Sequence, residues 1–499
     1  MALRLQVSVA PALPRLAWCA TVRANDDTVA VTRGAGVECG PQFAVEGAWD
    51  GRFEAGAFPA ARHFFGSGVR VDGNVVHCAA SSGLVDRIVY ARATGEVRCS
   101  NSLPVLLAAT GCRLDPGHDY TPECHALMAG RRRYRRAIHA VSLDGRESPQ
   151  FGQVFGENLR IDGDTVEHSD RDHAPKRLSG YADYVHALDE LVAGLVDNLG
   201  DPARTSRCHL FATVSSGYDS TAVASLVKAH GVRTCFTTVA AGEEALENGA
   251  AVASALGLET IALDRLQADH DYELAMLAAT LDGREAIFQS LLRHVGRLDG
   301  TAAVFTGYHG DKVWDRATSG RHLSPDILRG DTSGLNLTEA RLWSGFINVA
   351  LPFAFANQIA DIVAISNGGE MAPWRLQTGY DRPIPRRIAE TAGVPRELFG
   401  QAKRVVMDYA ALPRNPALRE ELFGYLEDRF GHGWLSRTAD AATRTLDFHL
   451  RSLPLGRRRG LSAASTNRLL WPAEKQLANR IHVWAVNVLA ERFARIFRG

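Results

Sequence analysis

The sequence predicts an α/β protein with a β-rich N-terminal half followed by a doubly wound parallel sheet. Up to about residue 165, short β-like runs alternate with turn signals, which is typical of an α+β sandwich. From residue 181, helical and strand-like runs alternate, which indicates βαβ units. Beyond about residue 320 the pattern is mostly helical with proline breaks, and predicts a helical C-terminal extension.

Turn residues carry the prediction for the N-terminal half. The stretches "VRVDGNVVHC", "IVYARATGEVRCS" and "LRIDGDTVEHS" each place Asp-Gly or Thr-Gly between alternating apolar residues, which indicates a hairpin. "SLPVLLAATG" predicts a short helix that ends at Gly111. The polar stretch 168–180 reads as a linker, so we expect one domain over 1–170 and another over 180–499.

The prediction for the second half rests on apolar residues whose spacing alternates between that of helices and that of strands. "YADYVHALDELVAGLVDNLG" has apolar residues at helical spacing, and "CHLFATV" at 208–214 predicts a buried strand. Helices are expected over 220–231, 244–257 and 272–283, and strands over 232–240, 258–264 and 301–307.

Composition excludes several classes of function. The chain has 499 residues with 56 basic and 56 acidic side chains, so no global field attracts nucleic acid or a membrane. The 8 cysteines include no C-x-x-C pair, and no apolar run reaches the length of a membrane span. The N-terminus is expected to form a first strand rather than a signal peptide, and we expect a soluble, cytoplasmic protein.

The stretch "VSSGYDSTAV" follows the first strand of the second half. Ligands of doubly wound sheets bind beyond the carboxyl ends of strands, where backbone N–H groups and the next helix attract phosphate. Asp219 repels phosphate unless Mg²⁺ lies between them. The alternative is that Asp219 and Ser220 only cap the helix. A Walker-type G-x-x-x-x-G-K-[ST] motif is absent from the sequence.

A second acidic loop, "TGYHGD", follows the strand expected at 301–307. Two strand-end loops that each carry an aspartate give Mg²⁺ two carboxylates beside nucleotide oxygens. We therefore expect a nucleotide phosphate group and Mg²⁺ as ligands. The resemblance described next implies that the nucleotide is ATP, bound by Ser215, Ser216, Gly217, Tyr218, Asp219, Ser220, Thr221 and Gly307, and the predicted metal ligands are Asp219 and Asp311.

These loops resemble those of a known family. "SSGYDST" is similar to the S-G-G-x-D-S pyrophosphate loop of the ATP pyrophosphatases, and "TGYHGD" to the second loop of their asparagine synthetase branch. The stretch 83–115 resembles that branch's glutamine amidotransferase domain. Glutaminase activity there needs an N-terminal cysteine, whereas this chain begins Met-Ala-Leu and its first cysteine is Cys19. The resemblance therefore implies an inactive glutaminase, as in β-lactam synthetases and lasso-peptide cyclases.

The same resemblance suggests catalytic residues. Tyr308 occupies the position at which β-lactam synthetases carry a tyrosine that helps to deprotonate the attacking amine, and Glu339 is the expected partner acid. Lys403 matches the family's late lysine, with Arg382, Arg386, Arg387 and Arg404 as alternatives. His309 is either a second proton carrier or a polar loop residue.

The expected activity is ATP-dependent amide formation through an acyl-adenylate, with release of pyrophosphate. The alternatives for the product are a lasso-peptide or other macrolactam, a β-lactam, or an ammonia-dependent amide of a small acid or sugar acid. A precursor-peptide protease is an expected partner of a cyclase, and the basic runs 131–136 and 457–459 are candidate guides for a peptide. A non-catalytic nucleotide-binding scaffold is the alternative from another class, and a serine hydrolase is disfavoured because no G-x-S-x-G elbow occurs.

Overall fold

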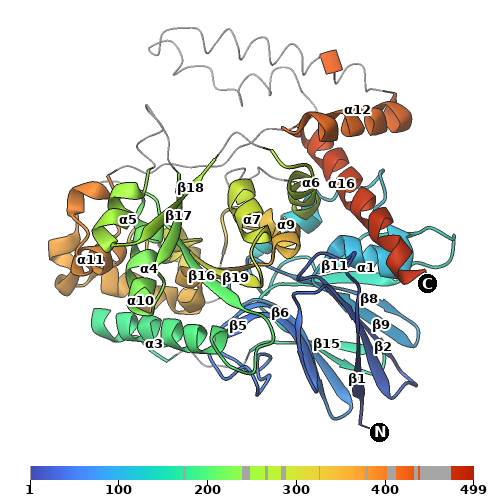
Figure 1. Ribbon diagram of the computed structural model, residues 1–499, viewed down its shortest axis with the longest axis horizontal. Coiled ribbons are helices and arrows are strands. Elements are labelled where there is room, and N and C mark those ends of the chain that lie inside the picture. Colours follow the sequence, from blue (N-terminus) through green and yellow to red (C-terminus); the bar gives the residue numbers. More distant parts are fainter. Residues whose placement is uncertain are drawn as a thin grey trace.

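The computed structural model shows a mixed α/β protein with two largely antiparallel sheets, one parallel sheet and flanking helices (Figure 1). The structure describes residues 2–171, 176–238, 248–264, 268–281, 288–324, 326, 328–376, 380–401, 412–431, 437–438 and 474–498.

The N-terminal half contains two sheets with an apolar core between them. In order across the first sheet, the strands are β1 (Arg4–Val9), β3 (Thr28–Arg33), β2 (Trp18–Arg23), β9 (Glu96–Ser100), β8 (Ile88–Ala93), β13 (Gln150–Val154) and β11 (Ala137–Ile138). In order across the second sheet, the strands are β15 (Thr165–Ser169), β14 (Asn158–Asp162), β7 (Val75–Ala79), β6 (Phe64–Asp72), β5 (Phe43–Trp49) and β4 (Glu38–Gly40). Only β1 and β3 pair in parallel in these two sheets, among the residues that the structure describes.

The three predicted hairpins are confirmed. Strands β6–β7, β8–β9 and β14–β15 each pair through a two-residue turn. Gly73 has a φ of +60° in the first of these turns, a conformation that side chains with a Cβ rarely adopt. The predicted short helix is α1 (Leu103–Thr110), and Gly111 ends it in the left-handed conformation.

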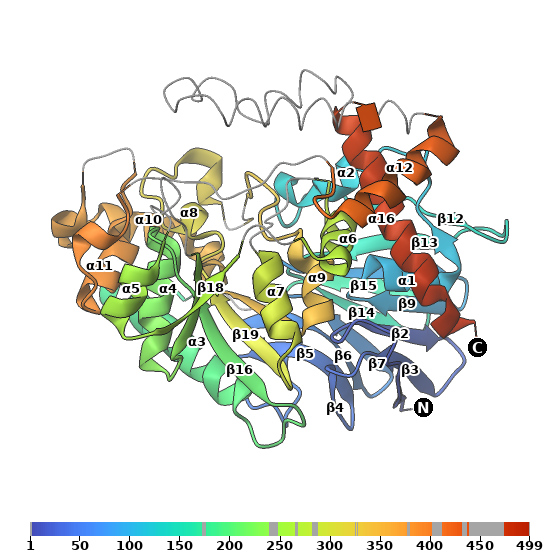
Figure 2. The same ribbon diagram turned by 45° about the horizontal axis from the view of Figure 1, so that its top comes forward.

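The second half contains a five-stranded parallel sheet with helices on both faces (Figures 1 and 2). Its strand order is β18 (Glu259–Leu263), β17 (Thr234–Thr238), β16 (Cys208–Thr213), β19 (Thr301–Thr306) and β20 (Phe346–Ala350). On one face lie α4 (Tyr218–Ala229) and α5 (Ala250–Leu256), and on the other lie α7 (Phe288–Gly296) and α9 (Leu337–Ser344). Beyond residue 320 the sequence pattern did not predict β20, a short, wholly buried strand that pairs with β19.

The remaining helices surround these sheets. They are α2 (Thr121–Cys124), α3 (Tyr181–Leu199), α6 (His270–Ala279), α8 (Gly310–Val313), α10 (Ile359–Asn367), α11 (Pro383–Thr391), α12 (Pro416–Phe430) and α16 (Glu474–Phe497), and two short strands, β10 (Cys112–Arg113) and β12 (Val141–Ser142), pair separately. Instead of extending from the second half, α16 packs against α1 and α6. Within the described ranges, no helix has both the length and the apolar character that a bilayer span requires.

Helix α9 connects the two halves through buried charges. Arg341 donates hydrogen bonds from two nitrogens to Glu46 at 2.8 Å each, and a third nitrogen donates to Asp86. The side chains of all three residues are at most 1% exposed. Burial raises the pKa of Asp86 to about 6, although Arg341 opposes that rise. The sandwich and the parallel sheet therefore share one ionic cluster.

Candidate functional site

The loop "VSSG" at 214–217 lies where the order of the parallel sheet reverses. The chain leaves β16, forms β17 on one side of it, and later forms β19 on the other side. In doubly wound sheets, this arrangement opens a crevice between the loops that follow the two central strands. The structure therefore brings the two predicted motifs to the same end of adjacent strands.

Hydroxyl groups fix the shape of the first loop. Ser215 and Ser220 place their Oγ atoms 2.7 Å apart, and the backbone N–H of Ser215 donates to Ser220 Oγ at 3.0 Å. The backbone N–H of Gly217 donates to Ser215 Oγ, and Thr221 Oγ1 lies 2.7 Å from the Gly217 carbonyl. Three of the hydroxyls predicted to bind phosphate are thus engaged within the loop itself.

The first turn of α4 carries no side-chain cap. Gly217 is the N-cap residue in an extended conformation, and no side chain accepts a capping hydrogen bond there. Asp219 accepts from Arg382 instead, and Ser220 binds Ser215. The alternative in which Asp219 and Ser220 merely cap the helix is therefore wrong.

Asp219, which is partly exposed, forms an ion pair with the buried side chain of Arg382. Arg382 Nη1 lies 2.7 and 2.6 Å from the two carboxylate oxygens of Asp219, and the Arg382 side chain is 4% exposed. Burial alone would lower the pKa of Arg382, but the charges of Asp219, Tyr380 and Asp311 together raise it. Both predicted metal ligands therefore act on one guanidinium group.

Two glycines allow the second loop to lie directly on the first. A Cβ atom at Gly307 would lie 2.5 Å from the backbone nitrogen of Ser220, and one at Gly310 would lie 2.4 Å from Cγ of Asp219. Such distances are far shorter than van der Waals contact, so any larger residue would push the loops apart. Gly307, a predicted ATP-binding residue, thus allows the two loops to pack closely. Gly310 does the same, although the sequence motif did not predict it as a site residue.

Asp311 lies on the short helix α8 beside a small polar cavity of about 260 Å³. Its Oδ2 is 3.7 Å from Lys312 Nζ, which is also 3.3 Å from Asp331. Although burial opposes it, the charge of Lys312 and hydrogen bonds from Ser333 lower the pKa of Asp331 to about 2. Asp331 is therefore ionised at neutral pH, and Lys312 lies between it and Asp311.

Tyr308 and His309 follow β19 at the centre of the second loop. The Tyr308 ring is partly buried and stacks on Phe288 with centroids 5.7 Å apart. His309 has a φ of +63°, is 4% exposed, and lies with its ring centroid 4.6 Å from that of Phe353. Burial, followed by the charge of Arg329, lowers the pKa of His309 well below its usual value, so its imidazole is neutral. Its Nε2 has no hydrogen-bond partner within the described part of the chain.

Glu339, the predicted partner of Tyr308, contacts the N-terminal half. Its carboxylate accepts hydrogen bonds from Ser102 Oγ at 2.6 Å and from the backbone N–H of Leu103 at 2.9 Å. Burial raises the pKa of this carboxyl group despite those hydrogen bonds. These contacts anchor the start of α1, and the partnership with Tyr308 stays a prediction.

The predicted cation Lys403 lies outside the described residues, as does the neighbouring candidate Arg404. Among the candidate arginines that the structure describes, Arg382 binds Asp219 in the site. Arg386 donates to the hydroxyl of Tyr218, and Arg387 pairs with Glu370 at 2.8 Å. Among the described candidates, Arg382 is therefore the one that binds Asp219 of the first loop and is affected by the charge of Asp311 in the second.

Tyr218 is an anchor for the loop. Its side chain is fully buried, with its ring centroid 4.8 Å from that of Tyr380 and 5.9 Å from that of Phe399. The backbone N–H of Gly400 donates to the carbonyl of Ser216 at 2.8 Å. The segment 380–400 thus clamps the first loop from the side, a contact that the sequence pattern does not reveal.

The predicted metal ligands of this site are two carboxylates, Asp219 and Asp311. The described residues include no group of three or more histidine, cysteine, aspartate or glutamate side chains arranged to hold a metal ion. Mg²⁺ commonly uses one or two protein carboxylates and takes its other ligands from phosphate and water. Asp219 and Asp311, both close enough to act on Arg382, fit that pattern.

Two features of the N-terminal half bear on the remaining predictions. Cys19 is buried in β2, and burial raises the pKa of its thiol to about 12, so it is a poor nucleophile.

The arginines of the basic run 131–136 form ion pairs with acidic residues. The pairs are Arg131 and Arg132 with Asp170, Arg133 with Asp326, Arg135 with Glu123 and Arg136 with Glu157. These pairs weaken its case as a guide for a peptide, and the run 457–459 lies outside the described residues.

Comparison with known proteins adds no relative: no family model matches the chain, and no curated protein matches it.

Proposed function

We propose that this protein is an ATP-dependent, AMP- and pyrophosphate-forming synthetase that joins a carboxylate to an amine. The observation that carries the proposal is the contact between the two strand-end loops. At the reversal point of the sheet, Gly307 and Gly310 lie against the first turn of α4, and Asp219 and Asp311 both act on Arg382. This is the place where doubly wound proteins bind nucleotides.

In this proposal the phosphates of ATP lie at the N-terminus of α4. The N-cap Gly217 has no side chain to block the approach, and the helix dipole favours negative charge there. Arg382 supplies a fixed positive charge beside the phosphates, while Asp219 and Asp311 would hold Mg²⁺, which offsets the charge of the nucleotide.

The proposed reaction has two displacements. A substrate carboxylate oxygen attacks the α-phosphorus, the bond to the bridging oxygen of the β-phosphate breaks, and pyrophosphate leaves. The amine nitrogen then attacks the acyl carbon and AMP leaves with the carboxylate oxygen, so that the amine must lose a proton. Tyr308 and the neutral His309, whose ring centroids lie 6.1 Å apart, are the groups proposed to move that proton.

We assign residues 180–499 to this synthetase and residues 1–170 to an amidotransferase-like domain without glutaminase activity. The buried Cys19 supports the second assignment because its thiol cannot serve as an accessible nucleophile. We therefore propose that the amine comes from the substrate, as in formation of a macrolactam, a lasso peptide or a β-lactam. The eight free cysteines suit a reducing compartment such as the cytoplasm.

A nucleotide-binding scaffold without catalysis is the second candidate. The observation that favours it is the ion pair with Arg382, which satisfies Asp219 without any ligand. ATP–pyrophosphate exchange separates the two candidates, measured with labelled pyrophosphate and a panel of peptide and small-molecule acids. We expect an acid to stimulate exchange in the native protein and in Arg52→Gln, an exposed control, but not in Asp219→Asn. If calorimetry shows that the protein binds Mg–ATP but no acid stimulates exchange, the result would support the scaffold. If the protein neither binds Mg–ATP nor catalyses exchange, both candidates would be contradicted.

A further inference from the structure

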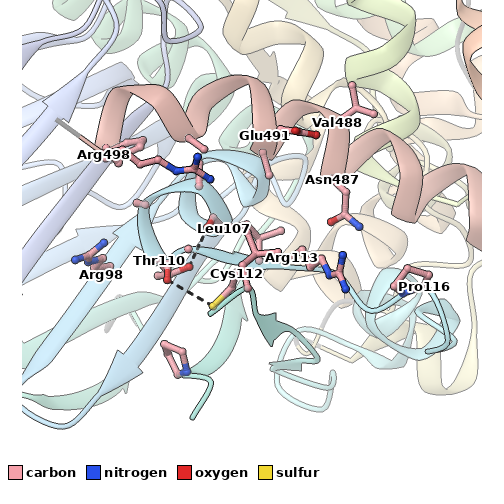
Figure 3. Close-up of a pocket in the computed structure, with 18 of the residues that line it drawn as sticks. Arg98, Leu107, Thr110, Cys112, Arg113, Pro116, Asn487, Val488, Glu491 and Arg498 are labelled. Atoms are coloured by element: carbon pink, nitrogen blue, oxygen red, sulfur yellow. Dashed lines mark hydrogen bonds between the residues drawn. The ribbon is translucent and has the colours of Figure 1, made fainter. Parts of the chain in front are cut away.

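A large cavity lies at the junction between α1 and the C-terminal helix α16, apart from the two loops described above (Figure 3). Its volume is about 620 Å³, within the range of cavities that bind small organic molecules. The C-terminal end of α1, the strand β10, and residues of α12 and α16 line it. The two loops of the proposed function contribute no lining residue.

Much of the wall is apolar. Leu107 and Ala108 of α1 face residues of α16, among them Val488 and Phe497. The cavity thus offers a hydrocarbon or aromatic group a surface from which water is removed, and that removal favours binding.

The rim carries excess positive charge. Arg113, Arg429 and Arg498 line the cavity and form no ion pair within the described ranges, whereas Arg98 is paired with Glu96 at 2.6 Å. Glu491 is the remaining acidic group of the lining. Three guanidinium groups against one carboxylate attract an anion.

The side chain of Tyr425 also lines the cavity, close to Arg429 and Arg113. The Tyr425 hydroxyl oxygen is inaccessible to solvent and has no hydrogen-bond partner in the described part of the chain. Burial raises the pKa of Tyr425 even though Arg429, Arg480 and Arg113 oppose the rise, so the group stays protonated and can donate. Arg113 and Arg429 are thus close enough to act on this hydroxyl. Arg498 lies at the opposite end from Arg113 (Figure 3).

We propose that this cavity binds an amphipathic organic anion, whose oxyanion head contacts Arg113 and Arg429. The apolar body of the ligand lies beside the contact between α1 and α16, against Ala108 and Val488. A carboxylate and a phosphate monoester share this head chemistry, and the proposal is independent of the synthetase activity.

Calorimetry with octanoate, octyl phosphate and neutral octanol tests the site on the full chain. We expect at least one of the two anions to bind in the millimolar range or tighter, and octanol to bind at least about tenfold more weakly because it forms no charged hydrogen bond. The anion that binds more tightly identifies the preferred head. Failure of both anions to bind, or equal binding of octanol, would overturn the proposal.

Substitutions locate the head within the cavity. Arg113→Gln and Arg429→Gln should each weaken anion binding about tenfold, whereas Arg52→Gln, at an exposed arginine outside the lining, should change it by less than about twofold. Ala494→Trp fills the lining and should abolish binding, with circular dichroism as the check on folding. Because the arginine variants change exposed residues, they test the site even if Ala494→Trp fails to fold. Equal effects of all three arginine variants would show a diffuse charge effect and overturn the assigned site.

Discussion

Arg382 and Asp219 form a two-point ion pair, with 2.7 and 2.6 Å between Arg382 Nη1 and the two carboxylate oxygens, although 163 residues separate them in the chain. The pair joins the segment before α11 to the first turn of α4. It therefore fixes the carboxylate that the sequence marks as the centre of the first loop.

Loss of either partner should destabilise the fold. Arg382→Gln leaves the Asp219 carboxylate, 20% exposed, without its paired cation, and Asp219→Asn leaves a guanidinium that is 4% exposed with only the weaker effect of Asp311. Each change should lower the free energy of unfolding by about 3 kcal/mol, because an uncompensated buried charge is costly. Urea unfolding measures this, and the double variant should cost less than the sum of the single ones. Additive effects would contradict a direct pair.

The contact between the loops predicts the effect of one added methyl group. Gly307→Ala should place Cβ against the Ser220 nitrogen, separate the loops, and cost about 1–3 kcal/mol of stability together with Mg–ATP binding. Gly369→Ala is the matched control, since a Cβ there meets no atom within 4 Å. Thermal unfolding and calorimetry with ATP give both readouts. Normal ATP binding by Gly307→Ala would show that the second loop is not part of the nucleotide site.

Tyr308 should act after adenylation. Tyr308→Phe keeps the ring that stacks on Phe288 but removes the hydroxyl, so acid-dependent pyrophosphate exchange should persist while amide formation falls about 100-fold. Quench-flow measurement of pyrophosphate and amide separates the two steps. An equal loss of exchange and amide formation would instead place the hydroxyl in ATP or acid binding. Glu339→Gln shows the same separation only if Glu339 is the partner of Tyr308.

His482 should make stability depend on pH. Burial, followed by the charge of Arg87, lowers the pKa of His482 from 6.5 to about 4, so the folded state holds its imidazole neutral. Below pH 6.5 the unfolded chain binds a proton that the folded chain does not, and the stability contributed by this group falls until about pH 4.

The variant His482→Gln isolates this effect. The variant should have a lower free energy of unfolding than the native chain, and this difference should shrink by up to about 1.4 kcal/mol per pH unit as the pH falls from 6.5 to 4. Asp86, whose pKa is about 6, changes stability with pH in the opposite direction, but it does so equally in both proteins and therefore cancels in the difference. Urea unfolding at four pH values measures the deficit, with the exposed His322→Gln as control. A deficit that is constant with pH would contradict a neutral buried imidazole.

The cluster that joins the two halves predicts a large effect from Arg341. Arg341→Met leaves Glu46 and Asp86 buried without a cation and should cost more than about 3 kcal/mol. Arg52→Gln, at a side chain that is 82% exposed, should change stability by less than about 0.5 kcal/mol. Chemical denaturation tests both, and a loss below about 1 kcal/mol for Arg341→Met would mean that the carboxylates are relieved by water or protonation.

Local patterns predict local structure well in this protein. The Asp-Gly and Thr-Gly turns define three hairpins because a two-residue turn depends on its own residues. The strand β20 escapes detection because "FINVA" is short, apolar throughout most of its length and without alternation.

Long-range contacts at the site are harder to predict. The two acidic loops are recognisable because each follows a strand, and the parallel sheet brings them together. The ion pair of Asp219 with Arg382 and the hydrogen bonds from Glu339 to Ser102 and Leu103 join residues 163, 237 and 236 positions apart. Whether Arg382 or Lys403 supplies the cation depends on tertiary packing, which sequence spacing does not encode.

The contact between α16 and α1 has a consequence for protein synthesis. Helix α1 belongs to the first quarter of the chain, but α16, which covers it, is translated after every other described element. During translation the apolar side of α1 therefore stays open to water and to other nascent chains until the last helix has left the ribosome. A stop codon just before residue 474 would leave that side of α1 uncovered in the finished chain, so early truncation should produce aggregation rather than a shorter working protein.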